Sequence, residues 1–165
     1  SFSKSLSLPG ERIGYLVIPD ELEDSATVIT AAAIANRVLG SVNAPSLMQK
    51  VIQKCVDAEV DVAAYDRNRL ALYNGLKECG FECIKPQGAF YVMMNLDGVM
   101  GRTIRGHAIG SSADFASAFV QEEMVATVPG SAFGADRYVR WSYATDMDTI
   151  RKGMDRLETF IKDLK

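Results

Sequence analysis

The sequence has little of several features that mark specialised classes of protein. It has one histidine, one tryptophan and three cysteines in 165 residues, and no apolar run comes near the length of a membrane span. Lysine and arginine total 18 against 21 acidic residues, and the basic residues are scattered. A nucleic-acid surface or an anionic-membrane surface is therefore not expected. Cys79 and Cys83 have no His or Cys neighbour at metal-ligand spacing, so we expect no metal site.

What is present is ordinary globular composition, with 48% hydrophobic and 24% charged residues. Reduced thiols are the expected state of the cysteines, and a polar N-terminus without an apolar signal segment predicts a cytoplasmic protein. His107 lies in a stretch rich in glycine and is interpreted as an ordinary exposed loop residue. The chain begins without Met and directly in a serine-rich segment, which predicts a shortened or processed form of a longer protein.

Hydrophobic periodicity and turn residues predict an alternation of strands and helices. Strands are expected over residues 12–18, 81–85, 89–95, 125–128 and 138–143. Helices are expected over residues 21–39, 46–56, 60–77, 113–123 and 149–162. This order predicts an α/β or α+β fold reached through a long connecting helix.

Several residues are expected to begin, end or orient these helices. Ser46 and Gln49 have the spacing of a capping box at the start of the second helix. Gly80 follows the third helix as its C-terminal cap. Leu70, Tyr73 and Leu76 recur at helical spacing and are expected to line one face of the third helix.

Lys4 stands in a short polar segment before a turn at residues 9–10. That turn can fold the chain back and bring Arg12 near Lys4 and the hydroxyls of Ser1 and Ser3. Two cations and two hydroxyl donors favour an anion, and a guanidinium binds phosphate through two parallel hydrogen bonds. A lysine beside a phosphate clamp can also hold an aldehyde cofactor covalently once its amine is deprotonated. The same residues also fit a solvated polar loop.

The complete pattern around this lysine is more specific than its composition. The run SFSK at residues 1–4, followed by RIGY at residues 12–15, resembles the lysine segment of the class I and II aminotransferases of the aspartate aminotransferase superfamily. In that family the lysine binds pyridoxal 5′-phosphate (PLP) covalently. The resemblance implies that Lys4 is the catalytic lysine and that Ser1 and Arg12 bind the cofactor phosphate. Ser3, whose hydroxyl belongs to the same anion-favouring group, is included as a cofactor-binding residue.

A second run, YVRWSYA at residues 138–144, resembles the late strand of the same family, whose arginine binds the substrate α-carboxylate. Rigid pairing of guanidinium with carboxylate suits this task because it fixes the orientation of the substrate. Taken without the resemblance, an arginine in an apolar strand is most often an ion-paired structural residue. The resemblance implies that Arg140 is the substrate-binding residue.

Three further stretches resemble the family in the family's own order. They are VPGSAFG at residues 128–134, KPQGAFY at residues 85–91, where Gly88 is expected to let the backbone pass close to the active site, and the segment around Asn43, Ser46 and Gln49. The resemblance implies the C-terminal small domain of a fold-type I PLP enzyme in residues 58–165, including the connecting helix. Residues 1–57 are then a remnant of the large PLP-binding domain.

The resemblance also implies a function and its limits. The activity is transfer of an amino group between an amino acid and a 2-oxo acid, in a homodimer, with the donor amino acid undetermined. The family's partner for the pyridine nitrogen and its phosphate loop precede the lysine, so we expect this chain alone to be inactive and to bind PLP weakly. Without the large sheet, the apolar face of the helix over residues 21–39 is expected to be exposed.

Two other hypotheses stay open at this point. The first is another fold-type I PLP enzyme, such as a carbon–sulfur lyase. The second is a non-catalytic dimerisation or interaction domain derived from an aminotransferase.

Overall fold

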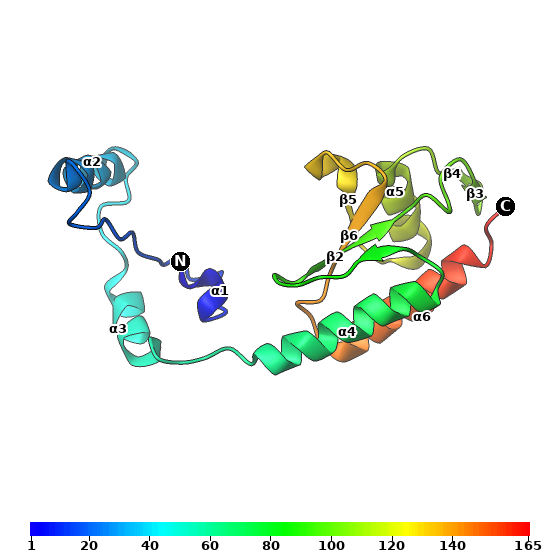
Figure 1. Ribbon diagram of the computed structural model, residues 1–165, viewed down its shortest axis with the longest axis horizontal. Coiled ribbons are helices and arrows are strands. Elements are labelled where there is room, and N and C mark those ends of the chain that lie inside the picture. The colour runs from blue at the N-terminus through cyan, green and yellow to red at the C-terminus, as the bar shows by residue number, and fades with distance from the viewer. The chain divides into compact units, whose positions relative to one another are not determined.

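The computed structural model describes all 165 residues, which form two compact units, Ser1–Asp61 and Val62–Lys165. The first unit contains three helices, α1 (Phe2–Ser5), α2 (Ser25–Val38) and α3 (Ser46–Cys55) (Figure 1). Ile13 is the one buried hydrophobic residue in this unit. The first unit therefore has almost no hydrophobic core of its own.

The strand expected over residues 12–18 is wrong, because residues 12–19 adopt no regular secondary structure. Leu16 and Val17 are 74% and 69% exposed. A strand needs a neighbouring strand to pair its backbone groups and a packed layer to cover one face. The first unit provides neither, so an apolar, β-rich run remains irregular.

Helix α2 begins at Ser25, four residues later than expected, because Asp24 adopts a left-handed conformation with φ of 62° immediately before it. The acidic residues expected in its first turn therefore lie outside the helix. As predicted, its apolar side chains are exposed, including Ile34 at 56% and Val38 at 81%.

Helix α3 has nearly the expected bounds but not the expected cap. Pro45 is its N-cap, and Ser46 is already the first helical residue. The side chain of Gln49 donates to the carbonyl oxygen of Ala44 at 2.8 Å. The expected capping box is therefore wrong, because the backbone enters the helix one residue earlier than a serine cap requires.

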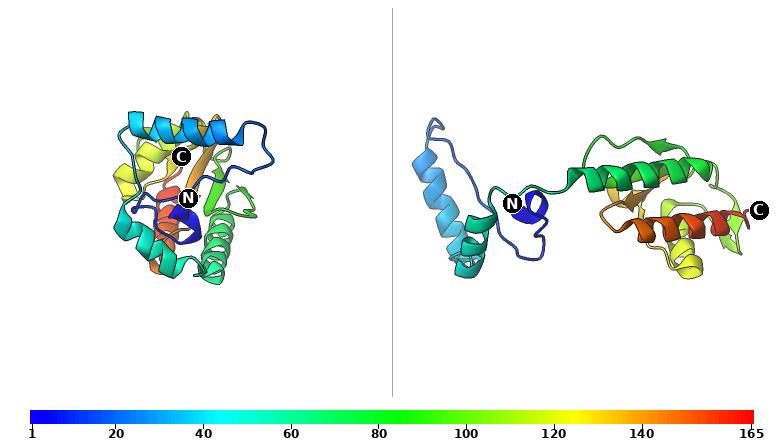
Figure 2. Two further views of the ribbon diagram at one scale, coloured as in Figure 1. Left: turned by 90° about the vertical axis from the view of Figure 1, so that its left-hand side faces the viewer. Right: turned by 90° about the horizontal axis from the view of Figure 1, so that it is seen from below.

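The second unit is a sheet covered by helices. Strands β1 (Cys83–Ile84), β2 (Tyr91–Asn95), β5 (Val128–Pro129) and β6 (Tyr138–Ser142) form an antiparallel sheet in the order β1-β2-β6-β5. The helices are α4 (Val62–Glu78), α5 (Ser112–Glu123) and α6 (Met147–Ile161). Helices α4 and α6 lie side by side along the sheet (Figures 1 and 2).

Alternation along the central strands divides the sheet into two faces. Val92 and Met94 of β2 and Val139 and Trp141 of β6 are buried in the core with the helices. The intervening residues, among them Arg140, lie on the opposite face because successive side chains of a strand point to opposite sides. The alternation of side chains along β6 therefore directs Arg140 away from the hydrophobic core.

Most elements of the second unit were predicted correctly. The helices expected over residues 60–77, 113–123 and 149–162 and the strands over 89–95 and 138–143 are confirmed to within two residues at each end. Gly80 ends α4 with φ of 86°, as expected. Of the three residues expected on one face of α4, Leu76 is fully buried and Tyr73 is half-buried, whereas Leu70 is 38% exposed. Leu72, which was not singled out, is buried.

Three short features differ from expectation. The strand expected over 125–128 is wrong, since β5 begins only at Val128, and the strand over 81–85 is reduced to β1. A hairpin of β3 (Thr103–Ile104) and β4 (His107–Ala108) was not predicted. His107 is therefore a strand residue, with its Nε2 3.0 Å from the carboxylate of Glu122. Two-residue strands lack the periodicity that prediction requires.

Candidate active-site residues

The lysine segment is held in a closed loop. The backbone N–H of Phe2 donates to the carbonyl oxygen of Ile13 at 3.1 Å. An added Cβ at Gly14 would lie 2.9 Å from the Cα of Ser1, so glycine permits this close approach. The chain therefore folds back between Lys4 and Gly14, as the turn at residues 9–10 predicts.

The two serines of this loop interact with one another. Ser1 caps α1 by accepting a hydrogen bond from the backbone N–H of Ser3 at 3.3 Å, and its hydroxyl donates to the Ser3 hydroxyl at 2.9 Å. Lys4 lies in the only turn of this short helix. The loop thus presents an amine and two hydroxyls within four consecutive residues.

Arg12 lies on the same loop but its guanidinium is directed elsewhere. Its backbone is in the left-handed region with φ of 51°, and its Nη1 donates to the carbonyl oxygen of Pro9 at 2.6 Å. The structure gives no hydrogen bond from Arg12 to Ser1 or Ser3. Loop closure brings the backbone of Arg12 beside the lysine segment without joining the side chains.

Arg140 occupies the centre of β6, on the sheet face opposite the core. Its Cζ lies 4.0 Å from the ring centroid of Tyr91 and 4.3 Å from that of Phe133. Its Nε is buried and has no hydrogen-bond partner. No ion pair holds Arg140, so it is not the ion-paired structural arginine that its place in an apolar strand also suggested.

The segment KPQGAFY borders a pocket of about 490 Å³ lined by Tyr65, Arg69 and Gly88, among others. The hydroxyl of Tyr143 donates towards the carbonyl oxygens of Gly88 and Ala89 at 3.3 and 3.1 Å. An added Cβ at Gly88 would meet nothing within 4 Å, whereas Ala89 has φ of 58°. Gly88 is thus not crowded within the second unit, and the passage of its backbone close to the active site stays a prediction.

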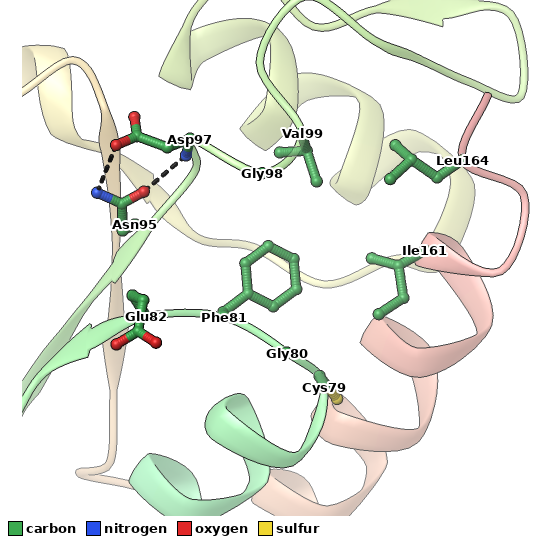
Figure 3. A pocket seen from close by; sticks show the side chains of 10 residues that line it. All are labelled: Cys79, Gly80, Phe81, Glu82, Asn95, Asp97, Gly98, Val99, Ile161 and Leu164. Atoms are coloured by element: carbon green, nitrogen blue, oxygen red, sulfur yellow. Dashed lines mark hydrogen bonds between the residues drawn. The ribbon is translucent and has the colours of Figure 1, made fainter.

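A different pocket, of about 410 Å³, lies at the far end of the sheet (Figure 3). Phe81, Val99 and Ile161 form its apolar wall, while Asp97 stands at its rim, held by two hydrogen bonds with Asn95. No lysine or arginine lines this pocket to bind a carboxylate. This pocket therefore does not resemble a site for amino acids or 2-oxo acids.

Comparison with known proteins identifies the family to which this fold, with its lysine loop and the surroundings of Arg140, belongs. The family described as aminotransferase class I and II matches residues 1–157. The chain therefore belongs to the class I and II aminotransferase family, a family of transferase enzymes. No helix is long and apolar enough to cross a membrane.

Individual relatives agree with this family. A probable aspartate/prephenate aminotransferase of Rickettsia felis is 35% identical over 94% of this chain and 38% of its own length. A probable N-acetyl-LL-diaminopimelate aminotransferase of Bacillus subtilis is 32% identical over 96% of this chain and 38% of its own length. The relatives named here are all aminotransferases, which does not favour the carbon–sulfur lyase hypothesis.

Solved structures show the same fold. An aminotransferase from Eubacterium rectale matches 98% of this chain with 42% identity and a TM-score of 0.81. An aspartate aminotransferase from Thermotoga maritima matches 98% with 27% identity and a TM-score of 0.77. In both cases this chain spans 38% of the solved chain. The mixed α and β fold is thus that of part of a fold-type I aminotransferase.

Proposed function

We propose that this chain supplies the cofactor lysine, Lys4, and the substrate-binding arginine, Arg140, of a PLP-dependent aminotransferase. The hydrogen bond between Phe2 and Ile13 carries this proposal, because it closes the loop that bears Lys4 in a chain of this family. We further propose that residues 1–57 belong to the large cofactor-binding domain and residues 58–165 to the small domain. The division into compact units at residue 61 supports this.

The donor groups of the lysine loop fit an aldehyde cofactor that carries a phosphate. Ser1 and Ser3 offer hydroxyl donors, and they already lie 2.9 Å apart. Arg12 uses one N–H on Pro9, and a guanidinium has five N–H donors in all. Ser1, Ser3 and Arg12 would bind the phosphate, and Lys4 the aldehyde carbon. When bound, PLP supplies the electron sink that makes the substrate α-proton removable.

The remaining chemistry belongs to side chains of this chain. Lys4 would hold the cofactor covalently through its deprotonated Nζ and would be freed when a substrate amine takes its place. The freed Nζ of Lys4 would then serve as the general base that accepts the α-proton of the substrate. Arg140 donates two hydrogen bonds to the α-carboxylate and keeps the α-carbon within reach of that amine.

The substrate class follows from Arg140. An amino acid and a 2-oxo acid share the carboxylate that its guanidinium would bind, and they are the two substrates of amino-group transfer. Relatives named for aspartate, prephenate and N-acetyl-LL-diaminopimelate support this class. Homodimer formation and cytoplasmic location stay predictions.

A chimera tests the proposal. This chain replaces the corresponding 38% of the Eubacterium rectale aminotransferase, and transamination is followed as 2-oxo acid formation. Lys4→Ala is expected to abolish turnover, and Arg140→Ala to weaken substrate binding. Lys162→Ala and Arg151→Ala, which change exposed residues of the second unit, serve as matched controls. Turnover by Lys4→Ala near the rate of the unsubstituted chimera would refute the role of Lys4.

The isolated chain provides a second test. These 165 residues span 38% of the length of the aminotransferases they match, so we expect neither tight PLP binding nor amino-acid turnover from them alone. Borohydride trapping and mass spectrometry detect any covalent cofactor on Lys4. Tight binding together with turnover by the isolated chain would contradict this expectation.

A further inference from the structure

The guanidinium of Arg140 is enclosed by two aromatic rings. Tyr91 and Phe133 each lie about 4 Å from its Cζ, at 4.0 and 4.3 Å. The two rings make no ring contact with one another. Two rings stacked this close on one face would touch, so we take them to cover opposite faces of the planar guanidinium. Each ring attracts the cation through its negative face, so the plane of the guanidinium is held between them.

We infer that Tyr91 and Phe133 are positioning residues that leave only the terminal Nη edge of Arg140 available, so that a ligand carboxylate binds end-on in the guanidinium plane. The inference rests on the proposed function of Arg140 as the carboxylate-binding residue. It adds which part of Arg140 binds, from which direction, and which residues impose that direction.

The strand register places Tyr91. Tyr91 pairs with Ser142 across β2 and β6, and Arg140 pairs with Met93. Tyr91 and Arg140 are therefore diagonal neighbours on one face of the sheet, a separation that an aromatic side chain spans. A change of register by one residue would turn Tyr91 to the core.

A tight turn places Phe133. It ends the short 3₁₀ helix η1 (Gly130–Phe133), which follows β5 directly. A Cβ at Gly130 would overlap the carbonyl oxygens of Ala135 and Tyr138. Only glycine lets the turn pack this closely, so Gly130 determines where η1 begins and hence where Phe133 lies.

Hydrogen bonds of Ser112, the first residue of α5, hold the same turn. The buried Ser112 accepts a hydrogen bond from the backbone N–H of Ser131 at 3.1 Å and donates from its own hydroxyl to Asp136 at 2.6 Å. Ser131 lies within η1 and Asp136 just beyond it. The turn that carries Phe133 is thus fixed on both sides of the ring.

The nitrogen atoms of Arg140 differ in access. Nε is buried without a partner. The terminal nitrogens are not among the buried unpartnered atoms, and no hydrogen bond or ion pair is found for them. They therefore reach solvent and have no protein acceptor. With both faces stacked and Nε enclosed, a carboxylate can approach only along the Nη1–Nη2 edge.

This geometry restricts the ligand. A carboxylate lying in the guanidinium plane makes two parallel hydrogen bonds. An aromatic or apolar part of the ligand cannot stack on Arg140, because both faces are covered, and must be accommodated elsewhere. Arg140 therefore selects for the carboxylate and not for the side chain attached to it.

Nuclear magnetic resonance on the ¹⁵N-labelled chain tests the arrangement directly. The side-chain resonances of Arg140, assigned by their loss in Arg140→Lys, should be displaced upfield by both rings relative to those of the exposed Arg151. Acetate, compared with chloride at equal ionic strength, should perturb the Nη–H resonances more than Nε–H. Absence of the upfield displacement, or a dominant response at Nε–H, would overturn the inference without any ring substitution.

Ring variants supply the second measurement. Tyr91→Leu and Phe133→Leu should each move the Arg140 resonances toward those of Arg151 and weaken acetate binding roughly two- to fivefold. Tyr91→Phe should retain both properties, because the ring alone is needed. Tyr73→Leu removes a half-buried ring of α4 as the matched control and should change neither.

The outcomes separate this inference from the proposed function. If Arg140→Lys lowers acetate binding while the ring variants do not, the positioning role is wrong and the carboxylate role stands. If Arg140→Lys leaves acetate binding unchanged, the carboxylate role of Arg140 fails as well. If a leucine variant unfolds, the resonances of the unsubstituted chain and of Tyr91→Phe decide.

Discussion

Ser112 donates two hydrogen bonds to the same carboxylate oxygen of Asp136, from its backbone N–H at 3.0 Å and from its hydroxyl at 2.6 Å. Ser112 is the first residue of α5 and is fully buried, whereas Asp136 lies in the loop before β6. This contact joins a helix N-terminus to the turn that carries Phe133. Its strength depends on the charge of Asp136 and hence on pH.

The hydrogen bonds from Ser112 lower the pKa of Asp136 below its ordinary value. A carboxyl whose folded pKa is depressed contributes stability above its unfolded pKa and loses it as pH falls through the folded pKa. We therefore expect Ser112→Ala to lower the stability of the second unit at neutral pH, and to lower it less in acid. Urea unfolding at neutral and acid pH measures the difference. Equal destabilisation at both would contradict the linkage.

Replacing Gly130 by alanine should disturb the turn before β6. The added methyl overlaps backbone carbonyl oxygens that cannot move independently, and such overpacking costs about 1–3 kcal/mol. Phe133 should also shift away from Arg140, which the Arg140 resonances would report. Gly98→Ala is the control, since an added Cβ there meets nothing within 4 Å. Similar stability of the two variants would show that the turn can adjust.

Truncation of the core should affect the two units very differently. Phe119 is fully buried and its ring lies 5.1 Å from that of Phe160 and 5.7 Å from that of Trp141. Phe119→Ala should cost about 3–5 kcal/mol. Ile34→Ala, in the exposed face of α2, should change stability by less than about 0.5 kcal/mol. Fluorescence of Trp141, the single tryptophan, reports unfolding. A comparable loss of stability in Phe119→Ala and Ile34→Ala would mean that the apolar face of α2 is covered in solution.

Cysteine reactivity provides a test of burial. Burial raises the pKa of the Cys83 thiol from 9.0 to about 11, which leaves it about a hundredfold poorer in thiolate than an ordinary cysteine at the same pH. Iodoacetamide labelling followed by mass spectrometry should therefore modify Cys83 far more slowly than Cys55 of the first unit. Equal rates in the folded chain, and not only in urea, would contradict the burial of Cys83.

Prediction of secondary structure succeeded where the deciding information is local. Strand β6 alternates buried and exposed residues along its own length, and α6 repeats apolar residues at helical spacing, so each is recognisable by itself. Residues 12–18 have the same strand-like composition and yet form no strand. Their conformation depends on neighbours that a local pattern does not contain.

The candidate site divides in the same way. Lys4 and Arg140 were recognised by residue type and motif, and their catalytic and substrate-binding roles stay proposals. Tyr91 and Phe133 were not singled out, although both belong to stretches that resemble the family. Alternation along β2 indicates which residues share a face with Tyr91. Only the pairing of β2 with β6, which the structure shows, places Tyr91 on the same face as Arg140.

By itself, the sequence determined the order of helices and strands in the second unit, the family, and the chemical groups available at each candidate position, because these follow from local periodicity and residue type. Only the tertiary structure decided that the strand-like run after Arg12 stays irregular, that the Arg12 guanidinium turns to Pro9, and that two rings enclose Arg140. Those outcomes depend on which backbones pair and which surfaces pack, and residues far apart in the chain settle them together.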